Sequence, residues 1–226
     1  MKTRPFLLSG VIGVALIAIS VIITLIGPGR SDKLADGFFS PVIAFEFATK
    51  AEDVSQIFDD ADSPALEKMV LRMTNSTRLD FLFLILYGAF LFTFSVKCTL
   101  LTGNRLYYLA ALLSIVAPIF DVLENLELLS IMALLKGGDF ISQLRYLHFY
   151  TWIKWGALAL IFLLLTPFFR SAGKFGRLIS FVAAVPLLLG ILAFFDPGLM
   201  NELFALSIIA MFSLIIVFSF HYRENS

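Results

Sequence analysis

Six uninterrupted apolar runs constrain what this chain can fold into more than any other feature of its sequence. Each is about twenty residues long, the length that a helix needs to cross roughly 30 Å of hydrocarbon. The chain has 226 residues, of which 59% are hydrophobic, whereas soluble domains are about 45–50% apolar. We therefore predict an all-α integral membrane protein with about six transmembrane helices. The runs are Phe6–Gly27, Leu79–Leu100, Leu106–Met132, Tyr146–Phe168, Arg177–Phe195 and Glu202–Phe220.

The loops between these runs predict how the helices are arranged. Short turns separate the last five runs, so consecutive spans are expected to be antiparallel neighbours. We expect a four-helix bundle, formed by a unit over residues 1–168, and two added C-terminal spans that form a hairpin over residues 169–226. Pro186 lies inside the fifth run, where a membrane helix tolerates proline.

The first run follows two basic residues, so a signal peptide is the alternative to a retained helix. Its apolar core of about 22 residues exceeds the roughly 7–15 of a signal peptide, and no small-residue cleavage pattern follows it. We favour a retained first helix.

The segment over residues 28–78 differs from the rest, with nine acidic and six basic side chains. Thr49 followed by Glu52 predicts a capping box for a short helix over Ala51–Asp59. Ser63-Pro64 predicts a second helix start that continues toward the next span. The apolar stretch Phe38–Phe47 is expected to lie on the membrane surface or to pack on helix ends. The segment therefore predicts a small helical extracytoplasmic loop.

Orientation follows from the basic residues of the short loops, which are enriched on the cytoplasmic side of membrane proteins. We expect both termini to be cytoplasmic and the 28–78 loop to lie outside. One side would carry Lys2, Arg4, Lys97, Arg105, Arg170, Lys174, Arg177 and Arg223, and the other short loops carry Lys136 and Arg145.

Several functional classes find no support in the sequence. The net charge is zero, so no basic surface for nucleic acid is indicated. The single Cys98 cannot form an internal disulfide. The chain has no phosphate-binding loop, no dinucleotide-binding glycine run, no nucleophile elbow and no zinc-ligand spacing. We therefore expect no cofactor and no metal, and the sequence names no catalytic residue.

One cluster of ionisable residues lies within the apolar runs. Asp121, Glu124 and Asn125 have i, i+3 and i, i+4 spacing, so they share one helical face of the third span. Lys154 of the fourth span lies about seven residues from the outer hydrocarbon edge, as does Asp121, on the order of 10 Å deep for each. We therefore expect opposite charges on adjacent antiparallel helices to meet.

Two further residues of the second span belong to this candidate site. Asp80 begins that span on the same side of the membrane, and Tyr87 lies two turns below it. If all ionised, Asp80, Asp121, Glu124 and Lys154 would carry a net charge of about −2, and like charges in a low dielectric push one carboxyl toward its neutral form. A proton shared among the carboxyls is one hypothesis, and a structural polar contact that fixes helix register is the alternative.

His148 is a secondary candidate. It lies among Tyr146, Phe149, Tyr150 and Trp152, which is the composition of an interfacial aromatic belt. The sequence favours a belt histidine over a catalytic or metal-binding one.

Three short motifs resemble a family of small uncharacterised bacterial membrane proteins. They are Ala44–Ala48 in the outer loop, Asp80–Phe83 at the opening of the second span, and Asp121–Asn125 in the third. The likeness covers roughly residues 5–168 and leaves out the last two spans. It implies a location in the bacterial cytoplasmic membrane and a unit made of the first four spans, and it implies no activity.

Three functions remain open at the level of sequence. The first is a component whose outer-leaflet polar pocket binds a lipid, a small ligand or a membrane-protein partner. The second is a small proton- or cation-coupled transporter, for which six spans would favour a homodimer. The third is a membrane enzyme on a lipid-borne substrate, with Asp121 or Glu124 as general base and Lys154 as electrostatic stabiliser.

Overall fold

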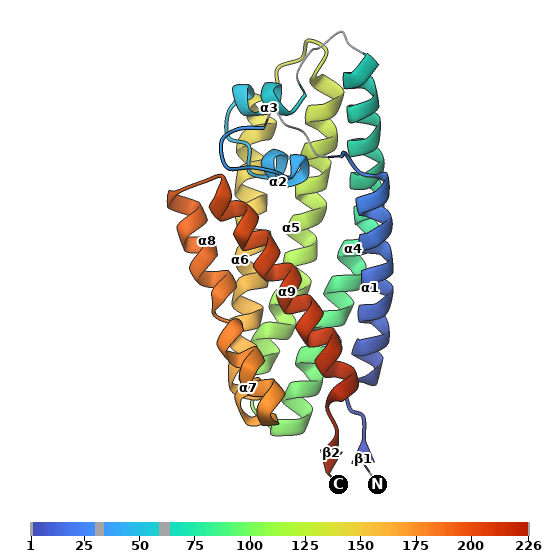
Figure 1. The fold of residues 1–226 in the computed structure, drawn as a ribbon, viewed down its shortest axis with the longest axis vertical. Coiled ribbons are helices and arrows are strands. Elements are labelled where there is room, and N and C mark those ends of the chain that lie inside the picture. The colour runs from blue at the N-terminus through green and yellow to red at the C-terminus, as the bar shows by residue number, and fades with distance from the viewer. Residues whose placement is uncertain (1, 30–33, 59–63, 226) are drawn as a thin grey trace.

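The computed structural model describes residues 2–29, 34–58 and 64–225. Within these ranges, six segments are long and apolar enough to cross a membrane (Figure 1). This confirms the predicted all-α polytopic membrane fold. The segments are α1 (Leu7–Ile26), α4 (Pro64–Thr102), α5 (Leu106–Leu134), α6 (Ile141–Ser171), α7 (Gly173–Val182) together with α8 (Val185–Phe195), and α9 (Leu199–His221).

The helices form an elongated bundle in which α5 packs between α4 and α6, and α1 packs on α4 and α9. Both termini lie at one end, which we call the termini end, and the segment between α1 and α4 lies at the other, the loop end (Figure 1). At the termini end, β1 (Lys2–Thr3) pairs antiparallel with β2 (Glu224–Asn225). Phe6 is fully buried there and stacks on Phe94, with ring centroids 4.3 Å apart.

The fifth apolar run is broken where the sequence predicted one continuous helix. α7 ends at Val182 and α8 begins at Val185, with Pro186 in the first turn of α8. Proline lacks an N–H group, and its ring clashes with the carbonyl of the fourth preceding residue, which here is Val182. The break therefore falls where Pro186 prevents α7 from continuing.

Two short helices, α2 (Pro41–Glu46) and α3 (Ala51–Ile57), lie in the described part of the segment between α1 and α4. The predicted capping pair was wrong by one residue, because Asp53 and not Glu52 accepts the hydrogen bonds from the backbone N–H groups. Asp53 Oδ2 lies 2.9 Å from Thr49 N and 3.0 Å from Lys50 N.

The sequence predicted a helix start at Ser63-Pro64. In the described chain α4 begins at Pro64 and runs without interruption into the second span. Ser63 and Asp59 lie outside the described residues.

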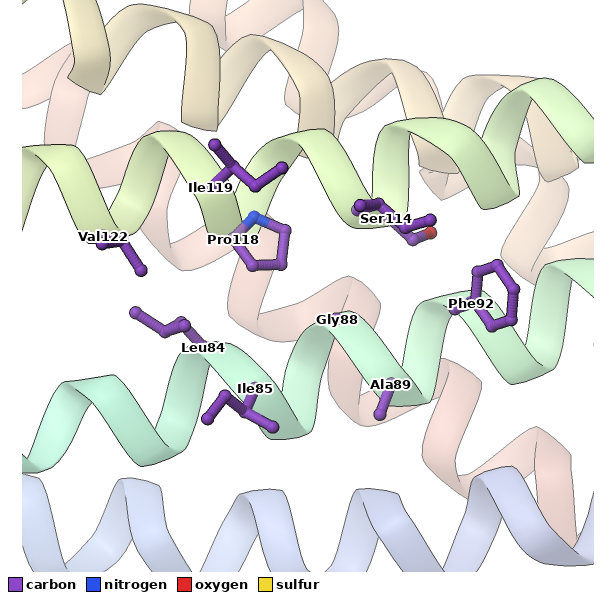
Figure 2. A pocket seen from close by; sticks show the side chains of 10 residues that line it. Leu84, Ile85, Gly88, Ala89, Phe92, Ser114, Pro118, Ile119 and Val122 are labelled. Atoms are coloured by element: carbon purple, nitrogen blue, oxygen red, sulfur yellow. The ribbon is translucent and has the colours of Figure 1, made fainter.

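A close contact between α4 and α5 shows how small residues set the spacing of the bundle. A Cβ atom placed on Gly88 would lie 2.6 Å from Pro118 Cγ and 3.2 Å from the Ser114 carbonyl oxygen. Gly88 and Pro118 both line a groove of about 410 Å³ whose other side chains are mainly apolar (Figure 2). A side chain at position 88 would force the two helices apart.

We expect Gly88→Ala to lower the free energy of unfolding by about 1–3 kcal/mol, the usual cost of overpacking. Gly156→Ala is the matched control, because a Cβ on Gly156 meets nothing within 4 Å. Alanine favours a helix over glycine by about 1 kcal/mol, so this control should be neutral or stabilising. Unfolding by a denaturing detergent from mild micelles measures both, and equal stability of the two variants would contradict the packing interpretation.

Candidate functional site

Lys154 of α6 lies at the centre of a buried ionic cluster. Its Nζ atom is 2.7 Å from Glu124 Oε2, 3.0 Å from Glu46 Oε2 and 3.5 Å from Asp121 Oδ1. The side chain of Lys154 is 7% exposed and that of Glu124 is fully buried. The predicted meeting of Asp121 and Lys154 on neighbouring spans is therefore confirmed.

Two hydrogen bonds join α4 to the same face of α5. The Tyr87 hydroxyl donates to Asp121 Oδ2 at 2.8 Å, and Asn125 Nδ2 donates to Asp80 Oδ2 at 2.7 Å. Asp121, Glu124 and Asn125 are all buried. The structure thus brings together the predicted residues of the second, third and fourth spans.

The depth of the cluster can be measured from the end of α1. Gly27 follows this helix, and a Cβ on Gly27 would lie 3.6 Å from Ser76 Cβ of α4. On α4, Asp80 lies one turn below Ser76. Its partner Asn125 lies level with it on α5, and Asp121 lies one turn below Asn125. At 1.5 Å per residue, Asp121 lies about 12 Å below the end of α1. The depth of about 10 Å expected from the sequence was counted from the hydrocarbon edge and stays a prediction.

Glu46, at the end of α2, is a member of the cluster that sequence reasoning did not place there. Its Oε2 atom accepts hydrogen bonds from Lys154 Nζ and, at 2.9 Å, from Trp155 Nε1. Its carbonyl oxygen accepts from Thr151 Oγ1 at 3.0 Å. The available signal was a single acid within the apolar stretch Phe38–Phe47. This stretch reaches α6 at Thr151–Trp155, well inside the helix and not at its end as one expectation had it.

Glu202, in the first turn of α9, was also missed. Its Oε1 atom accepts hydrogen bonds from Phe39 N at 2.9 Å and Ser40 N at 2.7 Å. These two backbone groups immediately precede α2. Glu202 therefore joins the start of α2 to α9, while Glu46 joins its end to α6.

His148 lies apart from the cluster. Its ring lies against Trp152, with centroids 6.2 Å apart, and its Nδ1 atom has no hydrogen-bond partner in the described chain. Within the described residues, no group of three or more histidine, cysteine or acidic side chains is arranged to hold a metal ion.

A cavity of about 400 Å³ opens from the ionic cluster. The cluster residues that line it are Glu46, Asp80, Tyr87, Asp121 and Lys154. Much of the remaining wall is apolar and comes largely from α1 and α9. The exposed lining residues are Ser20 and Thr24 on α1, Leu206 and Ile209 on α9, and Phe39 just before α2. We call the opening between the α1 and α9 residues the mouth.

The crossing of α1 and α9 explains the mouth. The two helices approach at the termini end, where a Cβ on Gly13 would lie 2.5 Å from Ile216 Cγ1 and one on Gly10 would lie 2.8 Å from the Phe220 ring. From there α9 runs diagonally away from α1 toward the loop end (Figure 1). The cavity lies where the two helices have separated, and α2 lies above it.

Comparison of the chain with protein-family models, with curated proteins and with solved structures gives no match. The fold and the cluster define the class as a polytopic helical membrane protein with a buried ionic site. What the site can do follows from its own chemistry: it can bind a polar group, hold a proton, or orient a group that enters through the mouth.

We expect Lys154→Met to lower the free energy of unfolding by about 3–5 kcal/mol, because it leaves buried carboxylates without their counter-ion. Adding Glu46→Gln and Glu124→Gln should restore part of this loss. Detergent unfolding measures each variant.

The matched control is Lys136→Met, which removes an ion pair of similar length, 3.1 Å to Glu67, whose side chains are 69% and 71% exposed. Exposed pairs contribute less than about 1 kcal/mol. If Lys154→Met were no more damaging than Lys136→Met, the cluster would not be the electrostatic centre of the bundle.

Proposed function

We propose that this protein binds a membrane amphiphile, with the polar head of the ligand against the ionic cluster and its chain in the mouth between α1 and α9. One observation carries the proposal: the same cavity has a wall of ionisable side chains and a mouth lined by residues of two lipid-facing helices. Sites for small ligands combine apolar walls with a few placed polar groups in this way. A single-chain amphiphile supplies both parts.

The distribution of basic residues supports a position of this cavity in the outer leaflet. The termini end carries Arg4, Lys97, Arg105, Lys174 and Arg223, and basic residues favour the cytoplasmic side. In that orientation both termini are cytoplasmic, and α2 and α3 lie outside. The bacterial cytoplasmic membrane is the location that the sequence motifs favour.

Transport of a proton or cation is the second candidate function. Pro118 one turn before Asp121 favours it, since ionisable residues beside a helix irregularity are typical of transport sites. Against it, a layer of fully buried aromatic rings fills the bundle between the cluster and the termini end. These rings are Phe90, Phe94, Phe162, Phe168, Phe169 and Phe218. Binding from one side needs no opening of this layer, and conduction does.

An enzyme on a lipid-borne substrate is the third candidate. The open cavity would admit such a substrate to Asp121. Tyr87, which donates to Asp121, is the one lining hydroxyl that the described contacts pair with a carboxylate. Thr24 and Ser76 instead donate to backbone carbonyl oxygens. This single pair gives a reaction less support than the cavity gives to binding.

Trp155 lines the cavity and can report on binding. In a Trp152→Phe background it is the sole tryptophan, because the chain has two. The probes are C18 amphiphiles with a dibrominated chain and an amine, alcohol or carboxylate head. Each is titrated into protein in mild micelles. At least one should quench Trp155 fluorescence saturably. Thr24→Phe, at the mouth, should weaken this quenching about tenfold or more, since the ring obstructs the path of the chain.

Val21→Phe is the matched control, because Val21 lies on the same helix, is 52% exposed and does not line the cavity. It should leave the quenching unchanged. A Trp155→Phe protein, with Trp152 as reporter, measures quenching from the surrounding micelle. If no probe quenched Trp155 saturably, or if both phenylalanine variants behaved alike, the binding proposal would be wrong.

A further inference from the structure

The walls of the cavity carry more acid than base. The described residues that line it include four carboxyl groups and one ammonium group, that of Lys154. The carboxyl groups are those of Glu46, Asp80, Asp121 and Glu202. An additional carboxyl, that of Glu124, lies directly behind Lys154. Lys154 cannot neutralise this set alone.

The carboxyl of Glu124 also has less compensation than its burial calls for. Glu124 Oε1 is buried and has no hydrogen-bond partner in the described chain, and the Glu124 side chain has 0% exposure. Glu124 points into the cluster, where its other oxygen is 2.7 Å from Lys154 Nζ. A buried charge without full compensation is costly in a low dielectric. Either a proton on one of these carboxyls or an additional positive charge from outside compensates such a charge.

Asp80 is the lining acid best placed to receive that charge. Its one hydrogen-bond partner among the described residues is the neutral amide of Asn125, and it forms no ion pair with them. Glu46 and Asp121 are already paired with Lys154, and Glu202 accepts from two backbone N–H groups. Asp80 therefore has the least compensated carboxylate on the wall.

The walls favour an organic cation over a bare ion. A volume of about 400 Å³ exceeds what a single metal ion fills. Aromatic rings contribute to the lining from several directions: those of Phe39, Phe83, Tyr87, Trp155 and Phe212. Such rings attract organic ammonium groups through their electron-rich faces.

Resting on the function proposed above, we infer that the ligand is a long-chain amine, whose cationic head binds at Asp80 and whose chain leaves through the mouth between α1 and α9. The charge of the head compensates the excess of carboxylates. A carboxylate head would add to that excess, and an alcohol head would leave it unchanged. The inference thus ranks amine above alcohol, and alcohol above carboxylate.

The Trp155 reporter tests this ranking in the unchanged cavity. With matched dibrominated C18 chains, we expect the amine to bind at least about tenfold more tightly than the alcohol, the effect of about 1.4 kcal/mol. Equal affinity of amine and alcohol would overturn the amine assignment and leave the binding of amphiphiles intact. Absence of binding by every probe would overturn both.

Asp80→Asn, which keeps the shape and removes the charge, should weaken amine binding about tenfold and leave alcohol binding unchanged. Glu67→Gln is the matched control on the same helix, since the Glu67 side chain is 71% exposed at the loop end. It should change neither. Equal loss of amine and alcohol binding in Asp80→Asn would overturn the role of Asp80, and the wild-type ranking does not depend on how this variant folds.

Butylamine distinguishes a lipid amine from a small soluble amine. When it competes with the long-chain amine, butylamine should bind with an affinity at least about a hundredfold lower than that of the long-chain amine. The reason is that each buried methylene contributes about 0.8 kcal/mol. Equal potency of butylamine would overturn the assignment to a lipid.

Discussion

One ammonium group connects three separate elements of this protein. Lys154 on α6 pairs with Asp121 and Glu124 on α5 and with Glu46 on α2. α5 and α6 also share an extensive interface without it, whereas α2 has six residues. A helix of that length is not stable alone in water. The position of α2 over the bundle therefore depends on its contacts, and the two carboxylates that hold it are Glu46 at its end and Glu202 near its start.

The cavity has a different origin, which is helix crossing. Glycines at positions 10 and 13 allow α1 to approach α9 closely at the termini end. Helices that meet at an angle must separate elsewhere, and these separate at the level where Lys154 and its acids lie. The ionic cluster and the mouth thus lie on the same cavity, and α1 and α9 each remain a continuous helix. Close approach at small residues at one end of the bundle thus goes together with a cavity nearer the other end.

Sequence patterns predicted the parts of this site that regular helices determine. Asp121 and Lys154 lie on long apolar runs, so their faces and depths follow from 3.6 residues per turn and a fixed rise. Tyr87 and Asp80 followed from the same geometry on α4. Glu46 and Glu202 could not be placed in this way, because the fold of a short loop segment decides where they go. The break between α7 and α8 was missed for a local reason, since proline in a membrane helix can kink it or end it and neighbouring contacts decide which.

The balance of charges bears on whether the cluster is structural or functional. A buried ion pair is weak support for stability, because apolar side chains of similar volume often do as well or better. A purely structural contact between α5 and α6 would need one acid for Lys154, as a polar contact that fixes register does. Here Lys154 has three carboxylate neighbours, and Asp80 adds another on the same wall without a basic partner among the described residues. Excess acid, where it is ionised, lowers the electrostatic cost of admitting a cation. Asp80 lies outside the ion pairs that hold α2 in place, so a cation can bind there without releasing that helix. The surplus of carboxylates thus supports the proposal that a cationic group enters the cavity, since one acid would be enough to hold the two helices together.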